Sequence, residues 1–185
     1  MTKNISGAKF IANKIQSWGV KDVFIFQGGA ITHILSEIGK NKKINYLCPH
    51  HEQTVAMAAD AYSRIKGLGI GLVTSGPGAT NLITGVASAY YDSIPCIFFT
   101  GQVGQFHITG KRSVRQRGYQ ETDVVSIFKP ITNFAYQLKN VEEIDYILEK
   151  AYYLATSNRP GPVVLDIPFN LQKAQIIKKK LIRFI

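Results

Sequence analysis

Residues 44–67 read INYLCPHHEQTVAMAADAYSRIKG, a short β-favouring run followed by an alanine-rich helical pattern. Pro49 cannot donate a backbone hydrogen bond to a sheet and disfavours helical geometry at Cys48, so we expect the strand to end there. The helix that follows is rich in good helix formers and ends at Gly67, a common C-terminal cap. Glu52 is therefore expected in the first turn of a helix that begins directly after a strand.

A second strand and turn follow at residues 70–91. Residues 70–74 have the pattern of a buried strand, and residues 75–81, SGPGATN, form a glycine- and proline-rich turn that opens a helix reaching about Tyr91. Such a turn can hold phosphate through backbone N–H groups, but neither Gly-Lys-Ser/Thr nor Gly-x-Gly-x-x-Gly is present. In open parallel sheets, ligands collect beyond the carboxyl ends of the strands. Glu52 is therefore placed to face a binding crevice, although a solvated first-turn acid is the simpler interpretation of this residue alone.

The rest of the chain alternates predicted strands and helices. Strands are expected at residues 23–26, 95–99, 131–138 and 163–167, and helices at residues 6–18, 30–38, 122–128 and 144–154. Asn140 and Glu143 form a capping-box pattern before the last helix. We therefore predict an α/β fold with a doubly wound, mainly parallel sheet flanked by helices, in one domain over residues 1–172 followed by a basic tail over residues 173–185.

Composition excludes several classes of protein. The chain has 185 residues, 45% of them hydrophobic, but it has neither an apolar run of about 18 residues to span a bilayer nor an apolar secretory start, so we predict no membrane association and a cytoplasmic location. Cys48 and Cys96 are expected to be buried, reduced and inert. No metal site is predicted, because no ligand pattern includes the four histidines, His33, His50, His51 and His107.

The net charge of +10 raises the question of nucleic-acid binding. About half of the excess lies in the tail, which has five cations and no acids and is expected to be a solvated charge run. No aromatic residues interleave with the basic ones in a pattern that would stack bases, so no nucleic-acid partner is predicted. A second basic cluster directly precedes Gln120, where it could meet an anionic substrate or a neighbouring subunit; it consists of Lys111, Arg112, Arg115 and Arg117.

The order of the motifs is more specific than any one of them. After the His-Glu-Gln segment and the Gly-Pro-Gly turn come residues 92–95 (DSIP), 100–102 (TGQ), 120–123 (QETD) and 159–163 (RPGPV). From about Ser6 to Gln172 this order resembles the N-terminal, pyrimidine-binding domain of the thiamine-diphosphate-dependent enzymes, and within them the acetolactate synthase and pyruvate oxidase group. The resemblance implies the thiamine diphosphate-binding fold.

The resemblance also implies roles for particular residues. Glu52 would hydrogen-bond the pyrimidine nitrogen of the cofactor and activate it for attack on a 2-keto acid, and Gln120 would lie near that substrate. The pyrimidine half of the cofactor would contact Gln27, Gly28, Gly29, Pro77 and Asn81. Structural interpretations stay open for three of these residues: Pro77 as a turn residue, Asn81 as a helix-start polar group and Gln120 as a capping side chain. Gln27 stands where acetolactate synthases usually carry a proline.

In this family the diphosphate and Mg²⁺ bind a separate domain with a Gly-Asp-Gly motif, which this sequence lacks. The resemblance therefore implies that the chain holds only the pyrimidine half, that a missing domain or partner chain holds the rest, and that these 185 residues alone are inactive. The predicted function is the N-terminal domain of a 2-keto acid carboligase or decarboxylase, nearest the acetolactate synthase large subunit. A subunit of a split decarboxylase and a catalytically silent relative remain as alternatives.

We also predict a homodimer. In the family, cofactor sites form between subunits, and small residues on two predicted helices would permit close helix contact across such an interface. These residues are Ala56, Ala59, Gly85, Ala87 and Ala89.

Overall fold

The computed structural model describes residues 4–110, 113–177, 181–182 and 184. Its centre is a six-stranded sheet in the order β3-β2-β4-β5-β7-β6, in which neighbouring strands are parallel. The strands are β2 (Asp22–Ile25), β3 (Asn45–Leu47), β4 (Gly69–Val73), β5 (Cys96–Gln102), β6 (Phe134–Gln137) and β7 (Pro162–Pro168). The predicted doubly wound, parallel α/β fold is confirmed.

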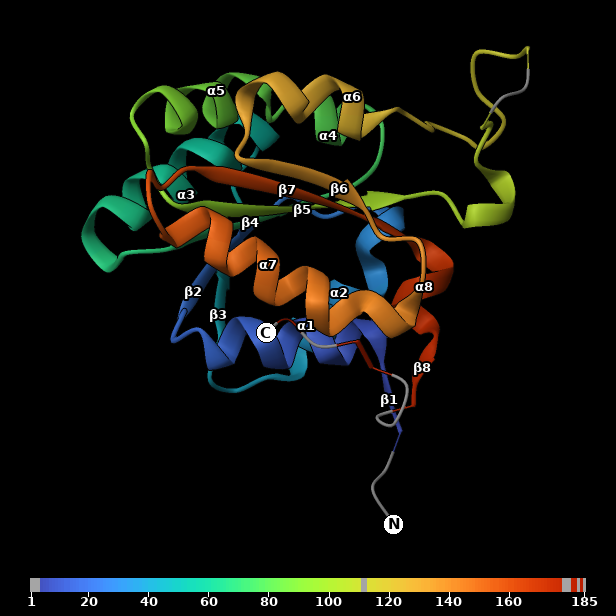
Figure 1. The fold of residues 1–185 in the computed structure, drawn as a ribbon, viewed down its shortest axis with the longest axis horizontal. Coiled ribbons are helices and arrows are strands. Elements are labelled where there is room, and N and C mark those ends of the chain that lie inside the picture. Colours follow the sequence, from blue (N-terminus) through green and yellow to red (C-terminus); the bar gives the residue numbers. More distant parts are fainter. Residues whose placement is uncertain (1–3, 111–112, 178–180, 183, 185) are drawn as a thin grey trace.

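Helices cover both faces of this sheet (Figure 1). One face carries α1 (Gly7–Ser17), α2 (Thr32–Lys40), α7 (Ile144–Thr156) and α8 (Phe169–Lys173), and the other carries α3 (Glu52–Lys66), α4 (Pro77–Thr80), α5 (Ile83–Tyr91) and α6 (Val124–Phe128). Short 3₁₀ turns lie at η1 (Gly29–Ile31), η2 (Gln105–His107), η3 (Lys129–Ile131) and η4 (Val141–Glu143). A cluster of buried apolar residues lies under each helical layer. Strands β4, β5 and β7 are buried along their whole length, as expected for central parallel strands covered on both faces.

Helix α3 begins and ends as its sequence predicts. Glu52 is its first residue, and His51 caps it by accepting a hydrogen bond at Nδ1 from the Gln53 N–H (3.1 Å). Gly67 ends the helix with a φ of 89°, a left-handed conformation that glycine adopts without steric cost. The predicted capping box of Asn140 and Glu143 is also present, in front of α7.

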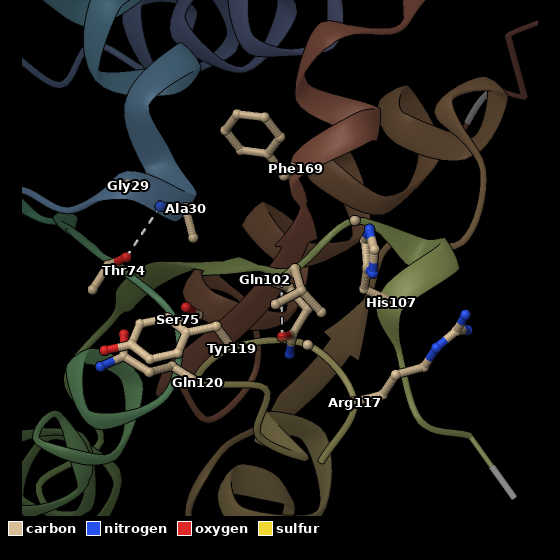
Figure 2. A pocket seen from close by; sticks show the side chains of 13 residues that line it. Gly29, Ala30, Thr74, Ser75, Gln102, His107, Arg117, Tyr119, Gln120 and Phe169 are labelled. Carbon is tan, nitrogen blue, oxygen red and sulfur yellow. Dashed lines mark hydrogen bonds between the residues drawn. The ribbon is translucent and has the colours of Figure 1, made fainter. Parts of the chain in front are cut away.

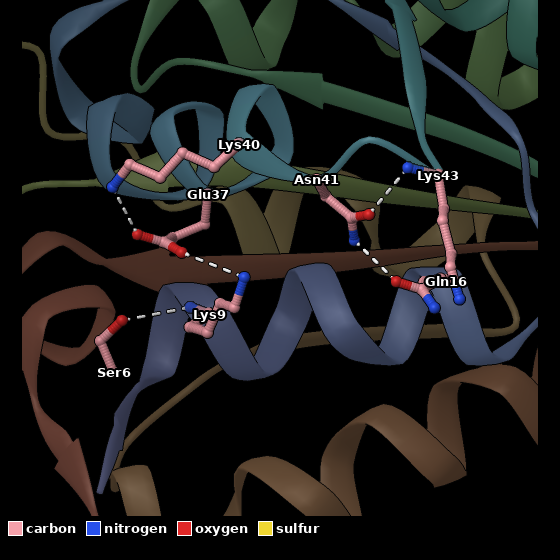
Figure 3. A network of polar contacts seen from close by, with 7 residues as sticks. All are labelled: Ser6, Lys9, Gln16, Glu37, Lys40, Asn41 and Lys43. Carbon is pink, nitrogen blue, oxygen red and sulfur yellow. Dashed lines mark hydrogen bonds and ion pairs between the residues drawn. The ribbon is translucent and has the colours of Figure 1, made fainter. Parts of the chain in front are cut away.

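A polar network fastens α1 to α2 (Figure 3). Ser6 caps α1 by accepting a hydrogen bond from the Lys9 N–H (3.2 Å), and Glu37 of α2 pairs with the Lys9 ammonium (3.6 Å). Asn41, just after α2, donates to the Gln16 side chain of α1 (2.9 Å). Exposed ion pairs contribute only about 0–1 kcal/mol each. The network therefore mainly orients α2, and with it the turn η1 that precedes this helix.

Several elements differ from the sequence prediction. β5 continues to Gln102 because its last polar side chains, Thr100 and Gln102, find buried hydrogen-bond partners. The helix expected up to Tyr91 is divided into α4 and α5. The strands β1 (Ile5–Ser6) and β8 (Gln175–Ile176) form a separate antiparallel pair, and strands this short give no recognisable pattern. β8 lies within the predicted basic tail, beyond residue 172. The domain boundary at residue 172 stays a prediction. Most of the cations of the tail lie outside the described residues.

The prediction that both cysteines are buried is wrong for Cys48, which is exposed. It follows β3, the edge strand of the sheet, whose own residues are all exposed, so no layer covers it. Cys96 is buried at the start of β5, and burial raises the pKa of its thiol, which keeps it protonated and unreactive. Both cysteines are free.

The small residues of α3 and α5 pack inside the subunit. A Cβ on Gly85 would lie 2.4 Å from the Cβ of Ala56, and a Cβ on Gly69 would lie 2.0 Å from the carbonyl oxygen of Ala59. Ala56, Ala59, Gly85 and Ala89 are all buried by their own chain, so these four cannot form the contact between subunits that was predicted from them, whereas Ala87, the fifth residue of that prediction, is half-buried. Their small size instead lets α3 approach both α5 and β4.

The described ranges contain neither a membrane span nor a metal site. No helix there is long and apolar enough to cross a membrane. No group of His, Cys, Asp and Glu side chains there is arranged to hold a metal ion.

Candidate functional site

Glu52 lies at the N-terminus of α3 and is 7% exposed. Its Oε2 accepts a hydrogen bond from Asn81 Nδ2 (2.9 Å). A Cβ on Gly78 would lie 3.5 Å from Oε1, and no group in the described part of the chain hydrogen-bonds that oxygen. The fold thus joins Glu52 to Asn81 and keeps one carboxylate oxygen for a further partner.

Thr74, the residue after β4, connects two turns. Its Oγ1 accepts a hydrogen bond from the Ala30 N–H (3.2 Å). A Cβ on Gly28 would lie 2.4 Å from the Thr74 Cβ, and a Cβ on Gly78 would lie 2.7 Å from its Cγ2. Only glycine fits at these two positions, so the Gln-Gly-Gly turn and the Gly-Pro-Gly turn meet at Thr74. The sequence signal for this residue is its place at the carboxyl end of a buried strand.

A cavity of about 480 Å³ opens beside these turns (Figure 2). Its wall comes from the residues after β4, the end of β5 and the loop that follows it, η1 and the start of α8. Gly29 and Gln120, two of the predicted site residues, line it, together with apolar groups that include Ala30, Val103 and Phe169. Its position beyond the carboxyl ends of parallel strands is the usual one for a ligand site in such folds.

Gln120 adopts an unusual backbone conformation, with a left-handed φ of 58°. A Cβ on Gly76, whose φ is also 58°, would lie 2.7 Å from the Gln120 carbonyl oxygen. Glycine at position 76 therefore allows the segment that carries Gln120 to lie directly on the Gly-Pro-Gly turn. Strained residues of this kind concentrate at functional sites, because the surrounding structure must hold them in place.

The predicted site residues fall into two neighbouring groups. Glu52 and Asn81 are hydrogen-bonded to each other, whereas Gly29 and Gln120 line the cavity, whose wall does not include Glu52. Residues 74–78 connect the two groups. The remaining predicted residues lie on the same turns: Gln27 and Pro77 are exposed, and Gly28 packs on Thr74.

Asp166 of β7, which no sequence motif singled out, is fully buried. It accepts hydrogen bonds from Thr100 Oγ1 (2.7 Å), Gln102 Nε2 (3.0 Å) and Gln137 Nε2 (2.7 Å). Burial raises the pKa of Asp166 to about 6, against the lowering effect of these three donors. In the sequence it is one polar residue within an apolar strand, and only the register of β5, β6 and β7 brings its partners together.

This buried network reaches the loop that carries Gln120. Gln102 also donates to the Thr122 carbonyl (2.9 Å) and accepts at Oε1 from the Val103 N–H (3.0 Å). Gln102 lines the cavity, so its side chain joins Asp166 to the cavity wall.

Glu121 organises the same loop. Its carboxylate accepts hydrogen bonds from Thr109 N–H (2.6 Å) and Oγ1 (2.7 Å) and from the N–H groups of Arg117 (2.9 Å) and Gly118 (3.2 Å). Burial alone would raise the pKa of Glu121, but these hydrogen bonds lower it below its ordinary value. One ionised side chain thus ties together the two arms of the loop.

Residues 5–127 match the family described as "Thiamine pyrophosphate enzyme, N-terminal TPP binding domain". The chain belongs to the thiamine pyrophosphate enzymes. This confirms the resemblance stated from the sequence, because thiamine pyrophosphate is another name for thiamine diphosphate. The parallel α/β sheet described above is consistent with the N-terminal domain of a thiamine pyrophosphate enzyme.

Relatives of this chain within the thiamine pyrophosphate enzyme family include acetolactate synthases. The large subunit from Lactococcus lactis subsp. lactis (strain IL1403) is 37% identical over 177 residues, which cover 95% of this chain and 30% of the relative. The chloroplastic enzyme of Arabidopsis thaliana is 40% identical over 168 residues, 90% of this chain and 24% of the relative. The isozyme 3 large subunit of Escherichia coli (strain K12) is 41% identical over 165 residues, 89% and 28% respectively. The chain therefore spans less than a third of the length of these relatives.

Proposed function

We propose that this chain is the pyrimidine-binding domain of a thiamine diphosphate-dependent 2-keto acid carboligase or decarboxylase, nearest the acetolactate synthase large subunit. The observation that carries the proposal is the buried Glu52 carboxyl, held by Asn81 through one oxygen and open at the other. Bound thiamine diphosphate supplies the electron sink that lets a 2-keto acid lose carbon dioxide. The residues around Glu52 fit its pyrimidine half, because a ring nitrogen needs one hydrogen-bonding partner and the buried Glu52 carboxyl offers one oxygen for it.

We assign each of the site residues a role in binding the cofactor or the substrate. The Asn81 amide fixes the rotation of the Glu52 carboxyl, so that Oε1 is left to exchange a proton with the pyrimidine nitrogen. Gly78 leaves room beside that oxygen. Gln27, Gly28, Gly29 and Pro77 contact the pyrimidine half through the two turns that meet at Thr74. Gln120 contacts the 2-keto acid from the cavity wall.

The proposal includes partners. A domain or chain with a Gly-Asp-Gly motif holds the diphosphate and Mg²⁺, whereas residues 1–172 form the pyrimidine-binding domain and residues 173–185 a basic tail. No nucleic-acid or membrane partner is proposed. The cytoplasmic location stays a prediction, and one relative is a chloroplastic enzyme. A split-decarboxylase subunit and a catalytically silent relative remain alternatives. Measuring the release of carbon dioxide from keto acids distinguishes the active alternatives from the silent one.

Reconstitution tests the proposed function. The chain is combined with the part of the protein, or the partner chain, that carries the Gly-Asp-Gly motif, and release of carbon dioxide from pyruvate and larger 2-keto acids is measured. We expect turnover that requires both parts, thiamine diphosphate and Mg²⁺, and none from the 185 residues alone. Micromolar, magnesium-dependent binding of the cofactor to the isolated chain in calorimetry would contradict the division of the site. An assembly that binds the cofactor but turns over no keto acid would favour the silent relative.

A homodimer through α3 and α5 is the expected assembly state. These helices lie side by side and expose large apolar side chains, Met57 and Ile65 on α3 and Ile83 and Tyr91 on α5. Exposed apolar groups of this size favour burial against a partner. Light scattering should give twice the chain mass, and Ile83→Asp should give the monomer mass. Tyr153→Asp, on the opposite helical layer, is the matched control and should remain dimeric; a monomeric wild-type chain at high concentration would refute the interface.

A further inference from the structure

The cavity that Gln120 lines has one positively charged wall. Arg117 and His107 line it, and no acidic side chain of the described residues does. Figure 2 shows these two side chains on the side of the cavity away from Thr74 and Ala30, with the exposed Arg117 guanidinium at its outer edge. The other walls are apolar or neutral, with Val103, Tyr119 and Phe169 among them. Among the described residues, a ligand that fills this space therefore meets a cation at one end only.

Arg117 is held in place by its own loop. Its backbone N–H donates to Glu121, and its Nη1 donates to the Phe106 carbonyl oxygen. The guanidinium carbon lies 4.6 Å from the centre of the Phe106 ring, a cation–π geometry, and the centre of the His107 ring lies 5.5 Å from the same point. Phe106 thus supports both polar side chains, and the guanidinium is oriented before any ligand arrives.

The donors of Arg117 are available for an anion. A guanidinium has five N–H donors in a rigid fork, and within the described residues the one contact of Arg117, to a backbone carbonyl, leaves most of them unused. Within the described residues no carboxylate pairs with the Arg117 side chain, because Glu121 is engaged by backbone N–H groups and Thr109. Forked donors of this kind match the two oxygens of a carboxylate or phosphate.

We propose that the keto acid bound in this cavity carries a second oxyanion, a carboxylate or a phosphate, at the end remote from its 2-keto acid group, and that Arg117 binds that oxyanion with His107 beside it. The 2-keto acid end rests on the proposed function, whereas the second anion rests on the loop geometry alone. Arg117 is thereby a residue that determines substrate specificity, distinct from Glu52 and Gln120.

Arg115 provides a matched control on the same loop. It lines a different cavity, together with Glu121 and Asp123, and not the one lined by Gln120. Replacing either arginine with glutamine removes one positive charge from the loop. Because the Arg117 side chain is exposed and its backbone hydrogen bond does not depend on the side chain, Arg117→Gln should fold normally.

Titration of the isotope-labelled chain, followed by NMR at neutral pH, tests the proposal. The probes are 2-oxoglutarate and 2-oxopentanoate, which share chain length and the keto acid group but differ in a terminal carboxylate against a methyl group. We expect 2-oxoglutarate to bind at least about tenfold more tightly, the range for a hydrogen bond to a charged group. Arg117→Gln should abolish this preference, and Arg115→Gln should keep it. Equal binding of the two probes to wild type, no saturable binding of either, or a preference that survives Arg117→Gln would overturn the proposal.

Two further probes test the anion site separately from the keto acid assignment, and the type of oxyanion that it binds. Glutarate has both carboxylates but no ketone. If it binds as tightly as 2-oxoglutarate and depends equally on Arg117, the anion site stands while the keto acid assignment of the proposed function fails. A phosphonate analogue, 2-oxo-4-phosphonobutanoate, shows which oxyanion the fork prefers, since the tighter of the two ligands identifies the natural group.

Discussion

Glu52→Gln, in the assembly completed by its diphosphate-binding part, should slow deuterium exchange at the reactive thiazolium carbon of the bound cofactor by about 10²–10⁴, the usual range for a positioned acid–base group. The amide keeps the size and polarity of the carboxyl group but cannot exchange a proton with the pyrimidine nitrogen. Exchange is followed directly by NMR of the cofactor after a rapid acid quench. Because this measurement concerns one proton, it does not depend on knowing the natural substrate.

Asn81 supplies the comparison for this variant. In Glu52→Gln the new side-chain amide still has a carbonyl oxygen that can accept the Asn81 hydrogen bond, so the thermal unfolding temperature should change little. Asn81→Ala retains the acid but removes the group that orients it, and should give a smaller loss than Glu52→Gln. An unchanged exchange rate in Glu52→Gln would exclude Glu52 from the mechanism and leave the silent relative as the better account.

Stability should fall as the pH rises from about 4 to about 6, by up to about 1.4 kcal/mol per pH unit, because of Asp166. In the unfolded chain this carboxyl loses its proton near its ordinary pKa of 3.8, whereas burial keeps it protonated in the fold up to about pH 6. Within that window the folded state binds more protons, so raising the pH favours unfolding. Above both pKa values no further loss is expected from this group.

Urea unfolding, followed by circular dichroism across this range, measures the effect. Asp166→Asn cannot titrate, so the difference in unfolding free energy between wild type and variant should carry the slope, and a flat difference would contradict the prediction. Asp123→Asn is a second check, because the Asp123 charge contributes to the raised pKa of Asp166 in the fold and its removal should lower the upper end of the window, while the lower end stays near pH 4. Glu37 and Glu121, whose pKa values are lowered, act with the opposite sign at more acidic pH.

The sequence predicted those helices and strands whose formation depends on residues close together along the chain. β4 and α3 follow from an apolar run and from a helix pattern with a C-terminal glycine, and both lie within a residue or two of their predicted positions. The pairing of Glu52 with Asn81 has no local signal, and the resemblance to a known family brought these residues to one site. The Asp166 network was missed because it depends on strand register, which pairs Asp166 with Thr100 and with Gln137.

The subunit contact predicted from small residues was wrong at four of its five residues, for a related reason. Ala56 and Gly85 are compatible with contact inside a subunit or between subunits, and composition cannot distinguish these cases. The distance from Gly85 to Ala56 decides it, because that space is already filled within the chain. Arg117 is the opposite case: a basic loop near Gln120 was visible in the sequence, but its fixed orientation depends on Glu121 and Phe106.

Thr74 imposes a rule on how this protein can change over time. Its side chain occupies the space that a Cβ would need at Gly28 and at Gly78, so substitutions at these three positions depend on one another. At Gly78 the obstacle is the Thr74 Cγ2, which Thr74→Ser would remove while keeping the hydroxyl that accepts from the Ala30 N–H. At Gly28 the obstacle includes the Thr74 Cβ, which only glycine at position 74 would remove, and that change also removes the acceptor for the Ala30 N–H. Single substitutions at Gly28 or Gly78 are therefore not tolerated. Libraries that aim to reshape the two turns must vary positions 28, 74 and 78 together.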